Sequence, residues 1–222
     1  MKIINSATLL SFLSNYLPPN PIIIEAGAFN GVDTKKMSSF WPQGTIHAFE
    51  PVPEIFEQLK KETSPYTNIE CYPYAISNHT GKATFYVAQH PKRPQAICQA
   101  GTLHKPKDRL NASPITYPST IEVATITLSD WAQSHNVGHA DFIWLDMQGH
   151  ELAALQASPD FIQKAALIYL EVNFISAYEN QPTESEINTW LESQGFTPIA
   201  RDFDEKTTRF FGNIVYQRTT IK

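Results

Sequence analysis

Cysteine and basic residues are scarce in this sequence, and each scarcity argues against a class of protein. Two cysteines, Cys71 and Cys98, occur among 222 residues. They are too few for a disulfide framework, and their spacing matches no metal-binding motif. The formal net charge is −5 at pH 7, whereas proteins that coat nucleic acids usually carry a net basic surface. We therefore expect a reducing, intracellular compartment and no nucleic-acid partner.

Long apolar runs are also missing. No segment approaches the roughly 18 uninterrupted apolar residues that a membrane-spanning helix needs. The first six residues lack the apolar core of a signal peptide. The composition, 42% hydrophobic and 18% charged, is typical of a globular protein. We expect one well-buried domain without a membrane span, located in the cytoplasm.

Short apolar strands alternate with helices along the chain. The pattern predicts strands over residues 21–24, 45–49, 69–72, 83–87, 121–126, 142–145, 167–170, 196–200 and 211–216. It predicts helices over residues 5–17, 53–63, 129–135, 151–157 and 183–194, the last with a capping box. Residues 88–118 have no clear period and are expected to form a loop insertion. This order predicts an α/β fold with a mostly parallel sheet, helices on both faces and an antiparallel C-terminal pair of strands joined by a polar turn at 202–208.

The first buried strand is followed by the loop Glu25-Ala26-Gly27-Ala28-Phe29-Asn30-Gly31. Gly27 lets the backbone turn tightly and approach a ligand, and Gly31 opens the next helix. The two glycines are four residues apart, so the loop is neither the dinucleotide fingerprint G-x-G-x-x-G nor a P-loop. No basic residue stands in the loop to meet a phosphate. The carboxylate of Glu25 instead suits a ligand with a cationic amino group.

Glu50 follows the next strand, nineteen residues beyond Gly31. A carboxylate at this place can accept both hydroxyl protons of a ribose. Together the loop and Glu50 predict an adenosyl ligand with an ammonium group and no phosphate, a description that S-adenosylmethionine (SAM) fits. A nicotinamide-dependent oxidoreductase is disfavoured by the missing third glycine and by Glu25.

Five segments resemble the FkbM-type methyltransferases, a branch of the class I SAM-dependent enzymes. The segments are residues 24–31, 47–53, 74–77 with Gly81, 126–130 and 141–151. The most specific parts are Phe-Glu-Pro-x-Pro at 49–53 and Asp-x-x-Gly-x-Glu at 146–151, and the resemblance covers roughly residues 20–175. Two residues depart from the family pattern, because Trp144 and Gln148 stand where the family has Lys and Glu.

The resemblance implies a Rossmann-like class I methyltransferase fold with a seven-stranded sheet and SAM as the cofactor. It implies O-methylation of a hydroxyl on a sugar, glycan or small metabolite. The residues expected to bind SAM are Glu25, Gly27, Ala28, Asn30, Gly31, Glu50, Pro51, Ala75, Ile76 and Asp146. The same cofactor site would permit N-methylation of a peptide or small amine. The acid lost at Gln148 would permit a non-catalytic SAM-binding sensor or partner protein.

Methyl transfer to a hydroxyl benefits from a general base within hydrogen-bond reach. Three candidates follow strands: Asp146 after residues 142–145, His150 four residues on, and Glu171 after residues 167–170. Alternatively, Asp146 could cap the following helix, and His150 could be an exposed residue of its first turn. The spacing of the three is no metal signature, so we expect no bound metal.

A basic segment lies within the loop insertion, at residues 88–113. It contains His90, Lys92, Arg93, His104, Lys105, Lys107 and Arg109 against a single acid, Asp108. We expect this segment to be a lid that contacts an anionic or glycan acceptor. The alternative is a solvated surface loop.

Overall fold

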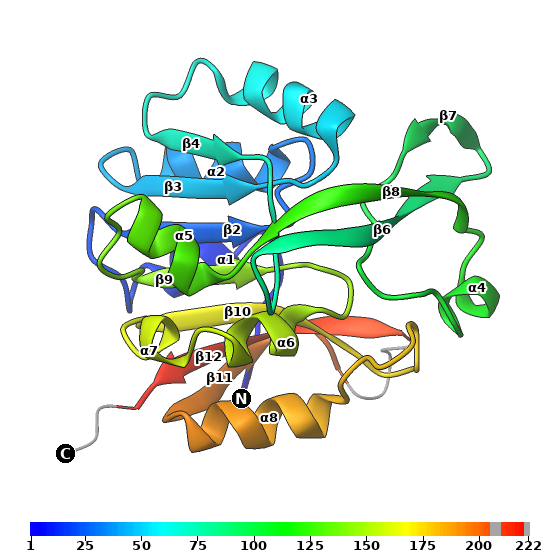
Figure 1. Ribbon diagram of the computed structural model, residues 1–222. Helices are drawn as coiled ribbons and strands as arrows, with labels where there is room; N and C mark the ends of the chain where they lie inside the picture. Colours follow the sequence, from blue (N-terminus) through cyan, green and yellow to red (C-terminus); the bar gives the residue numbers. More distant parts are fainter. Residues whose placement is uncertain (205–209, 220–222) are drawn as a thin grey trace.

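The computed structural model describes residues 1–204 and 210–219 and has an eight-stranded sheet at its centre (Figure 1). The strand order is β1-β11-β12-β10-β9-β2-β3-β4. The strands are β1 (Lys2–Ile3), β2 (Ile22–Ala26), β3 (Thr45–Phe49), β4 (Ile69–Tyr72), β9 (Phe142–Leu145), β10 (Leu167–Asn173), β11 (Phe196–Arg201) and β12 (Phe211–Arg218). Every neighbouring pair is parallel except the two that β12 makes with β10 and β11.

The predicted mostly parallel sheet with an antiparallel C-terminal strand is thus confirmed. The sheet has one strand more than the seven expected, because the two-residue strand β1 pairs with β11. A run of two residues carries no detectable period, so the sequence pattern did not reveal it. The polar turn predicted at 202–208 lies mostly outside the described residues.

Helices cover both faces of this sheet (Figure 1). They are α1 (Leu9–Leu13), α2 (Val32–Phe40), α3 (Pro53–Thr63), α5 (Leu128–Ser134), α6 (Glu151–Gln156), α7 (Pro159–Ile162) and α8 (Glu184–Ser193). The short helix α4 (Arg109–Ala112) lies apart from this sheet (Figure 1). The capping box predicted for the last helix is present between Thr183 and Glu186. The first helix is shorter than the predicted span 5–17, because Asn5 and Thr8 form a hydrogen-bonded turn before it.

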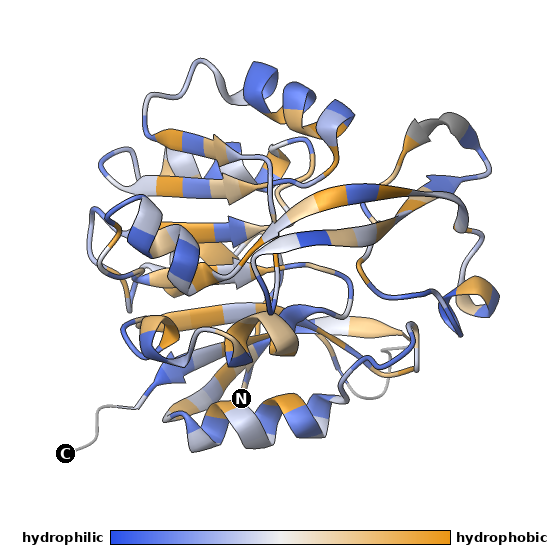
Figure 2. Ribbon diagram, in the orientation of Figure 1, coloured by the Kyte–Doolittle hydropathy of each residue, from blue (hydrophilic) through white to orange (hydrophobic). Residues whose placement is uncertain are grey.

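The strand β2 shows why the sheet is covered on both sides. Successive residues of a strand point to opposite faces, and Ile23 and Ile24 are both fully buried. Ile23 belongs to a core with residues of α1 and α2, and Ile24 to a second core with residues of α5, α6 and α8. Figure 2 shows apolar residues gathered in the strands, whereas α3 and α8 carry hydrophilic residues as well as apolar ones.

A second, four-stranded sheet extends away from the main one (Figure 1). Its strands, in the order β5-β8-β6-β7, are β5 (Ala75–Ile76), β6 (Gly81–His90), β7 (Arg93–Ile97) and β8 (Thr116–Ile126). The insertion predicted as a loop at 88–118 therefore contains β7, α4 and the ends of β6 and β8. The pattern missed these elements because much of the pair β6–β8 is exposed and carries polar side chains.

No helix of the described residues is long and apolar enough to cross a membrane.

Candidate active site

The carboxyl ends of β2 and β9 meet where the strand order reverses. From β2 the chain continues to β3 and β4 on one side, whereas β9 and β10 lie on the other side. Gly27 follows β2 with φ +90°, and a Cβ there would lie 2.0 Å from the backbone oxygen of Asp146. The loop after β2 therefore requires glycine at this place, because it packs directly on the residue after β9. Ligands of open α/β sheets bind at such a reversal.

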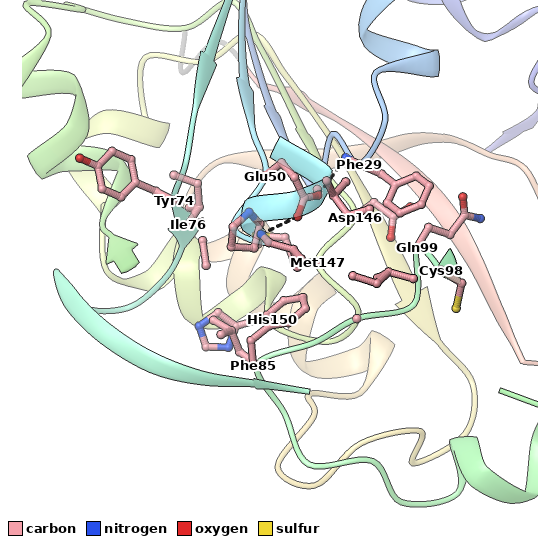
Figure 3. A pocket seen from close by; sticks show the side chains of 18 residues that line it. Phe29, Glu50, Tyr74, Ile76, Phe85, Cys98, Gln99, Asp146, Met147 and His150 are labelled. Atoms are coloured by element: carbon pink, nitrogen blue, oxygen red, sulfur yellow. Dashed lines mark hydrogen bonds between the residues drawn. The ribbon is translucent and has the colours of Figure 1, made fainter. Parts of the chain in front are cut away.

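A cavity of about 600 Å³, the first cavity, opens at this edge of the sheet (Figure 3). It is lined by Gly27, Phe29, Glu50, Pro51, Val52, Ile55, Tyr74, Ala75, Ile76, Phe85, Ile97, Cys98, Gln99, Gly101, Leu103, Asp146, Met147 and His150. Figure 3 shows the side chains of Glu50, Asp146 and Met147 around this space.

Glu50 is the buried carboxylate of the first cavity, with 5% of its surface exposed. Its Oε2 accepts the backbone N–H of Phe29 at 3.1 Å, and its Oε1 accepts that of Val52 at 2.8 Å. Burial raises the pKa of Glu50 to about 7, although both hydrogen bonds oppose the rise. Each carboxylate oxygen has a second lone pair, so Glu50 can still accept two hydroxyl protons from a ligand.

The lining of the first cavity fits an adenosyl ligand without phosphate. None of its lining residues, all of which the structure describes, is a lysine or an arginine. Aliphatic and aromatic side chains such as Ile76, Phe85 and Met147 provide walls for a flat, apolar ring. The charge and shape of the cavity therefore suit SAM better than a dinucleotide.

The residues expected to bind the cofactor divide into two groups. Six line the first cavity: Gly27, Glu50, Pro51, Ala75, Ile76 and Asp146. The other four, Glu25, Ala28, Asn30 and Gly31, are not among its lining residues. Glu25 is buried and accepts a hydrogen bond of 2.5 Å from Thr34 Oγ1, and burial raises its pKa to about 8.

A second cavity, of about 1230 Å³, lies next to the first. It is lined by Phe29, His90, Lys92, Arg93, Ile97, Cys98, Gln99, Ala100, Arg109, Ile115, Asp146, Gln148, Glu171 and Phe211. Five residues line both cavities: Phe29, Ile97, Cys98, Gln99 and Asp146. Ligands bound in the two cavities would therefore both border Asp146.

Two of the candidate bases lie side by side in the second cavity. Leu145 and Leu170 are paired in the parallel ladder, so the next residues, Asp146 after the end of β9 and Glu171 within β10, lie at the same level. The strand that contains Glu171 is longer than predicted, because it continues its pairing with β12 up to Asn173. The amide of Gln148 donates hydrogen bonds to both carboxylates. Burial raises the pKa of each, and the positive charge of Arg109 opposes the rise.

His150, the third candidate, lines the first cavity and not the second. Its ring nitrogens are within 3.0 Å of Ser77 Oγ and of His104 Nε2. Burial, with the nearby His104, lowers the pKa of His150 to about 4. The imidazole is therefore neutral near pH 7 and already engaged at both nitrogens.

Several residues around these cavities were not candidates in the sequence. Residues 97–101 and Phe85 reach the site from the small sheet, and Phe211 from the start of β12. Tyr178 donates a hydrogen bond to Gln148 Oε1 at 2.8 Å. No local pattern marks these residues, because their place depends on how the small sheet is positioned next to the edge of the main one.

Among the described residues, no group of three His, Cys, Asp or Glu could hold a metal ion.

Comparison with known proteins identifies the family. The model of the methyltransferase FkbM domain matches residues 25–198. The 2-O-methyltransferase NoeI of Sinorhizobium fredii is 25% identical over 164 residues, which are 73% of this chain and 68% of NoeI. The hexuronic acid methyltransferase AglP of Haloferax volcanii is 24% identical over 133 residues, which are 59% of this chain. The match spans 48% of AglP, about half its length.

Solved structures share the fold. Magnesium protoporphyrin IX methyltransferase (ChlM) of Synechocystis, with bound SAM, has a TM-score of 0.55 at 12% identity and covers 96% of this chain and 77% of its own. Fibrillarin of Aeropyrum pernix, in complex with SAM, has a TM-score of 0.52 at 12% identity and covers 95% of this chain and 74% of its own. Because the family model covers most of the chain, the protein belongs to the methyltransferase FkbM domain family and is a SAM-dependent methyltransferase.

Proposed function

We propose that the protein methylates a hydroxyl group of a carbohydrate bound in the second cavity. The observation that carries the proposal is that Asp146 lines both cavities, so that one carboxylate borders methyl donor and acceptor together. Two relatives support parts of the proposal: the name of NoeI, a 2-O-methyltransferase, supports transfer to oxygen, and that of AglP, a hexuronic acid methyltransferase, supports an acidic sugar as the acceptor.

The first cavity holds SAM in this proposal. Glu50 accepts the ribose hydroxyls, and Ala75, Ile76 and Met147 contact the adenine. The loop at Gly27 approaches the methionine end. When bound, SAM supplies an electrophilic methyl group on a sulfonium. The protein orients the acceptor and excludes water from the point where the two cavities meet.

Asp146 is the proposed general base. The acceptor oxygen forms the new bond to the methyl carbon as the carbon–sulfur bond breaks, and the hydroxyl proton passes to the carboxylate of Asp146. Glu171 lies beside it and shares its hydrogen-bond donor Gln148. His150 stays outside this catalytic set, since it borders the first cavity and both its ring nitrogens have partners.

An acidic sugar suits the second cavity best. His90, Lys92, Arg93 and Arg109 line it, and all four belong to the basic segment 88–113. The positive charges of Lys92, Arg93 and Arg109 can attract an acceptor carboxylate. Not every basic residue of the segment takes part, because Lys105 and Lys107 do not line the cavity and Lys105 pairs with Glu179 at 2.9 Å.

Transfer of labelled methyl from SAM to a panel of neutral and uronic acid glycans tests the proposal. We expect O-methylated product, with the uronic acids preferred, and loss of turnover in Asp146→Asn. Transfer to amines only would contradict it.

The basic residues have a matched control in the same segment. The double variant Lys92→Ala/Arg93→Ala should raise the KM for an acidic acceptor at least several-fold and leave SAM affinity unchanged. Lys105→Ala/Lys107→Ala removes the same charge outside the cavity and should leave the KM near the wild-type value. Equal effects of both pairs would show that only the net charge matters.

A further inference from the structure

Gln148 is the hydrogen-bond donor shared by the two acids of the second cavity. Its side chain is buried, with 7% of the residue surface exposed. The amide nitrogen Nε2 donates to Asp146 Oδ1 at 2.8 Å and to Glu171 Oε2 at 3.2 Å. One amide group has two N–H bonds, so each carboxylate receives one of them.

The orientation of this amide is determined by its other contacts. Tyr178 donates its hydroxyl proton to Gln148 Oε1 at 2.8 Å, so the nitrogen must face the carboxylates. The backbone is held as well, because Thr102 Oγ1 donates to the carbonyl oxygen of Gln148 at 2.9 Å. This bond supports a φ of 55°, a left-handed conformation that is uncommon outside glycine.

The two carboxylates differ in how many of their oxygens have a hydrogen-bond partner. Each oxygen of Glu171 accepts one hydrogen bond, since Gln148 Nε2 donates to Oε2 and Asn173 Nδ2 donates to Oε1 at 3.0 Å. Asp146 receives the bond from Gln148 at Oδ1, and its Oδ2 has no hydrogen-bond partner in the part of the chain that the structure describes. Asp146 therefore has an oxygen to offer to a ligand.

We propose that Gln148 is a positioning residue, whose amide holds Asp146 and Glu171 side by side as carboxylates and leaves Oδ2 of Asp146 open to the acceptor hydroxyl. The inference rests on the proposed function, because it assigns the role of base to Asp146. It gives Gln148 a task that a carboxylate in its place could not perform. An acid at position 148 has no donor to offer unless it is protonated.

Charged and titratable groups of the neighbouring elements make this donor important. Acidic groups face the pair from three elements, namely Glu25 on β2, Asp33 on α2 and Glu151 on α6, and each interacts with Asp146 or Glu171. Tyr169 on β10 and Tyr178 also lie near the pair, both as neutral phenols whose pKa is raised by burial. Arg109 on α4 is the cation that lowers the pKa of both acids. With several acids this close to the pair, loss of an N–H donor favours uptake of a proton by one of the two carboxylates.

The pH profile of kcat separates this role from a purely structural one. Wild-type kcat should fall as the pH falls, because the base must be ionised to take the hydroxyl proton. Gln148→Glu keeps the shape but adds a third acid, and it should move the midpoint of the profile upward by about one pH unit or more. Gln148→Ala removes both donors and should move the midpoint in the same direction.

A second readout needs neither acceptor nor turnover. Infrared spectroscopy detects the carbonyl stretch of protonated carboxyl groups. We expect Gln148→Glu to gain such a signal near neutral pH relative to wild type. The control Gln181→Glu makes the same exchange nearby, where the side chain accepts the backbone N–H of Tyr178 and need not donate. It should change neither the infrared signal nor the kcat midpoint.

The outcomes distinguish the inference from the function on which it rests. Lower kcat with an unmoved midpoint in Gln148→Ala, or no new protonated carboxyl in Gln148→Glu, would overturn the positioning role. If instead wild type methylates no carbohydrate, the proposed acceptor is wrong, while the infrared comparison still decides whether Gln148 controls protonation of the pair.

Discussion

The affinity for SAM should depend on pH through Glu50. Burial raises the pKa of this carboxyl to about 7 in the free protein, and its ionised form is the one that accepts two ribose hydroxyls. Hydroxyl donors from the ligand favour that form. Binding therefore weakens as the pH falls through about 7, where Glu50 takes up a proton that must be released before the ligand binds.

The size of the effect follows from the titration of one group. With a pKa of about 7, Glu50 is about nine-tenths ionised at pH 8 and about one-tenth ionised at pH 6. The Kd for SAM should then be roughly tenfold higher at pH 6 than at pH 8, which corresponds to about 1.4 kcal/mol.

Glu50→Gln separates the charge from the shape of the side chain. An amide retains one acceptor oxygen, so the hydrogen bonds to Phe29 and Val52 and to the ligand cannot all be kept. Loss of a hydrogen bond to a charged group costs about 1.5–3 kcal/mol, or roughly a ten- to 150-fold increase in Kd. The remaining binding should no longer depend on Glu50 ionisation.

Isothermal titration calorimetry between about pH 6 and pH 8 measures both effects. Glu54→Gln makes the same exchange on an exposed residue of α3 and should keep the wild-type affinity and slope. Any slope from titration of the ligand itself is common to all three proteins, so differences between them isolate Glu50. A wild-type Kd that is flat over this range, or an equal slope in Glu50→Gln, would refute the reasoning.

Three further predictions concern stability and are measured by urea unfolding. Gly27→Ala places a Cβ 2.0 Å from the backbone oxygen of Asp146 at positive φ and should cost roughly 3 kcal/mol or more. Gly138→Ala meets nothing within 4 Å and should change stability by less than about 0.5 kcal/mol; equal losses would contradict the contact. Thr183→Ala removes the capping box of α8 and should cost about 1 kcal/mol with SAM affinity unchanged, whereas an unchanged stability would show that the cap contributes nothing. Burial raises the pKa of Glu25 from its ordinary value of 4.5 to about 8 in the folded protein. The folded state is therefore most stable, as far as Glu25 is concerned, at a pH below the ordinary pKa, and up to about 5 kcal/mol of stability is lost as the pH rises from there through about 8. Glu25→Gln should flatten that fall, and parallel pH profiles of wild type and variant would disprove the assignment.

Local patterns predicted most of the main sheet. The β-branched run before Glu25 predicted β2, because a strand buried on both faces needs apolar residues at successive positions. Thr183 and Glu186 marked the start of α8, since a capping box is made within four residues. Both patterns involve only residues close together in the chain, so the elements can be predicted from them without knowledge of the fold.

The strands of the small sheet were harder to predict from the sequence. The partly exposed strands β6 and β8 carry polar residues and continue into the segment predicted as a loop. Their pairing joins residues far apart in the chain, such as Phe85 and Ile121, which are 36 positions apart. Strand pairing over that distance depends on register and on the surface against which the sheet packs, and neither leaves a local period.

Residue spacing along the chain was enough to predict the order of strands and helices and the place of Gly27 and Glu50 at strand ends, and hence the kind of cofactor. Strand ends meet at one edge of any parallel sheet, so spacing along the chain was enough. Three features could not be predicted without the three-dimensional structure: the contact of Glu25 with Thr34, the position of Arg109 in the second cavity, and the position of the Gln148 amide between Asp146 and Glu171. Those contacts depend on side-chain direction and on elements distant in the chain, which no spacing encodes.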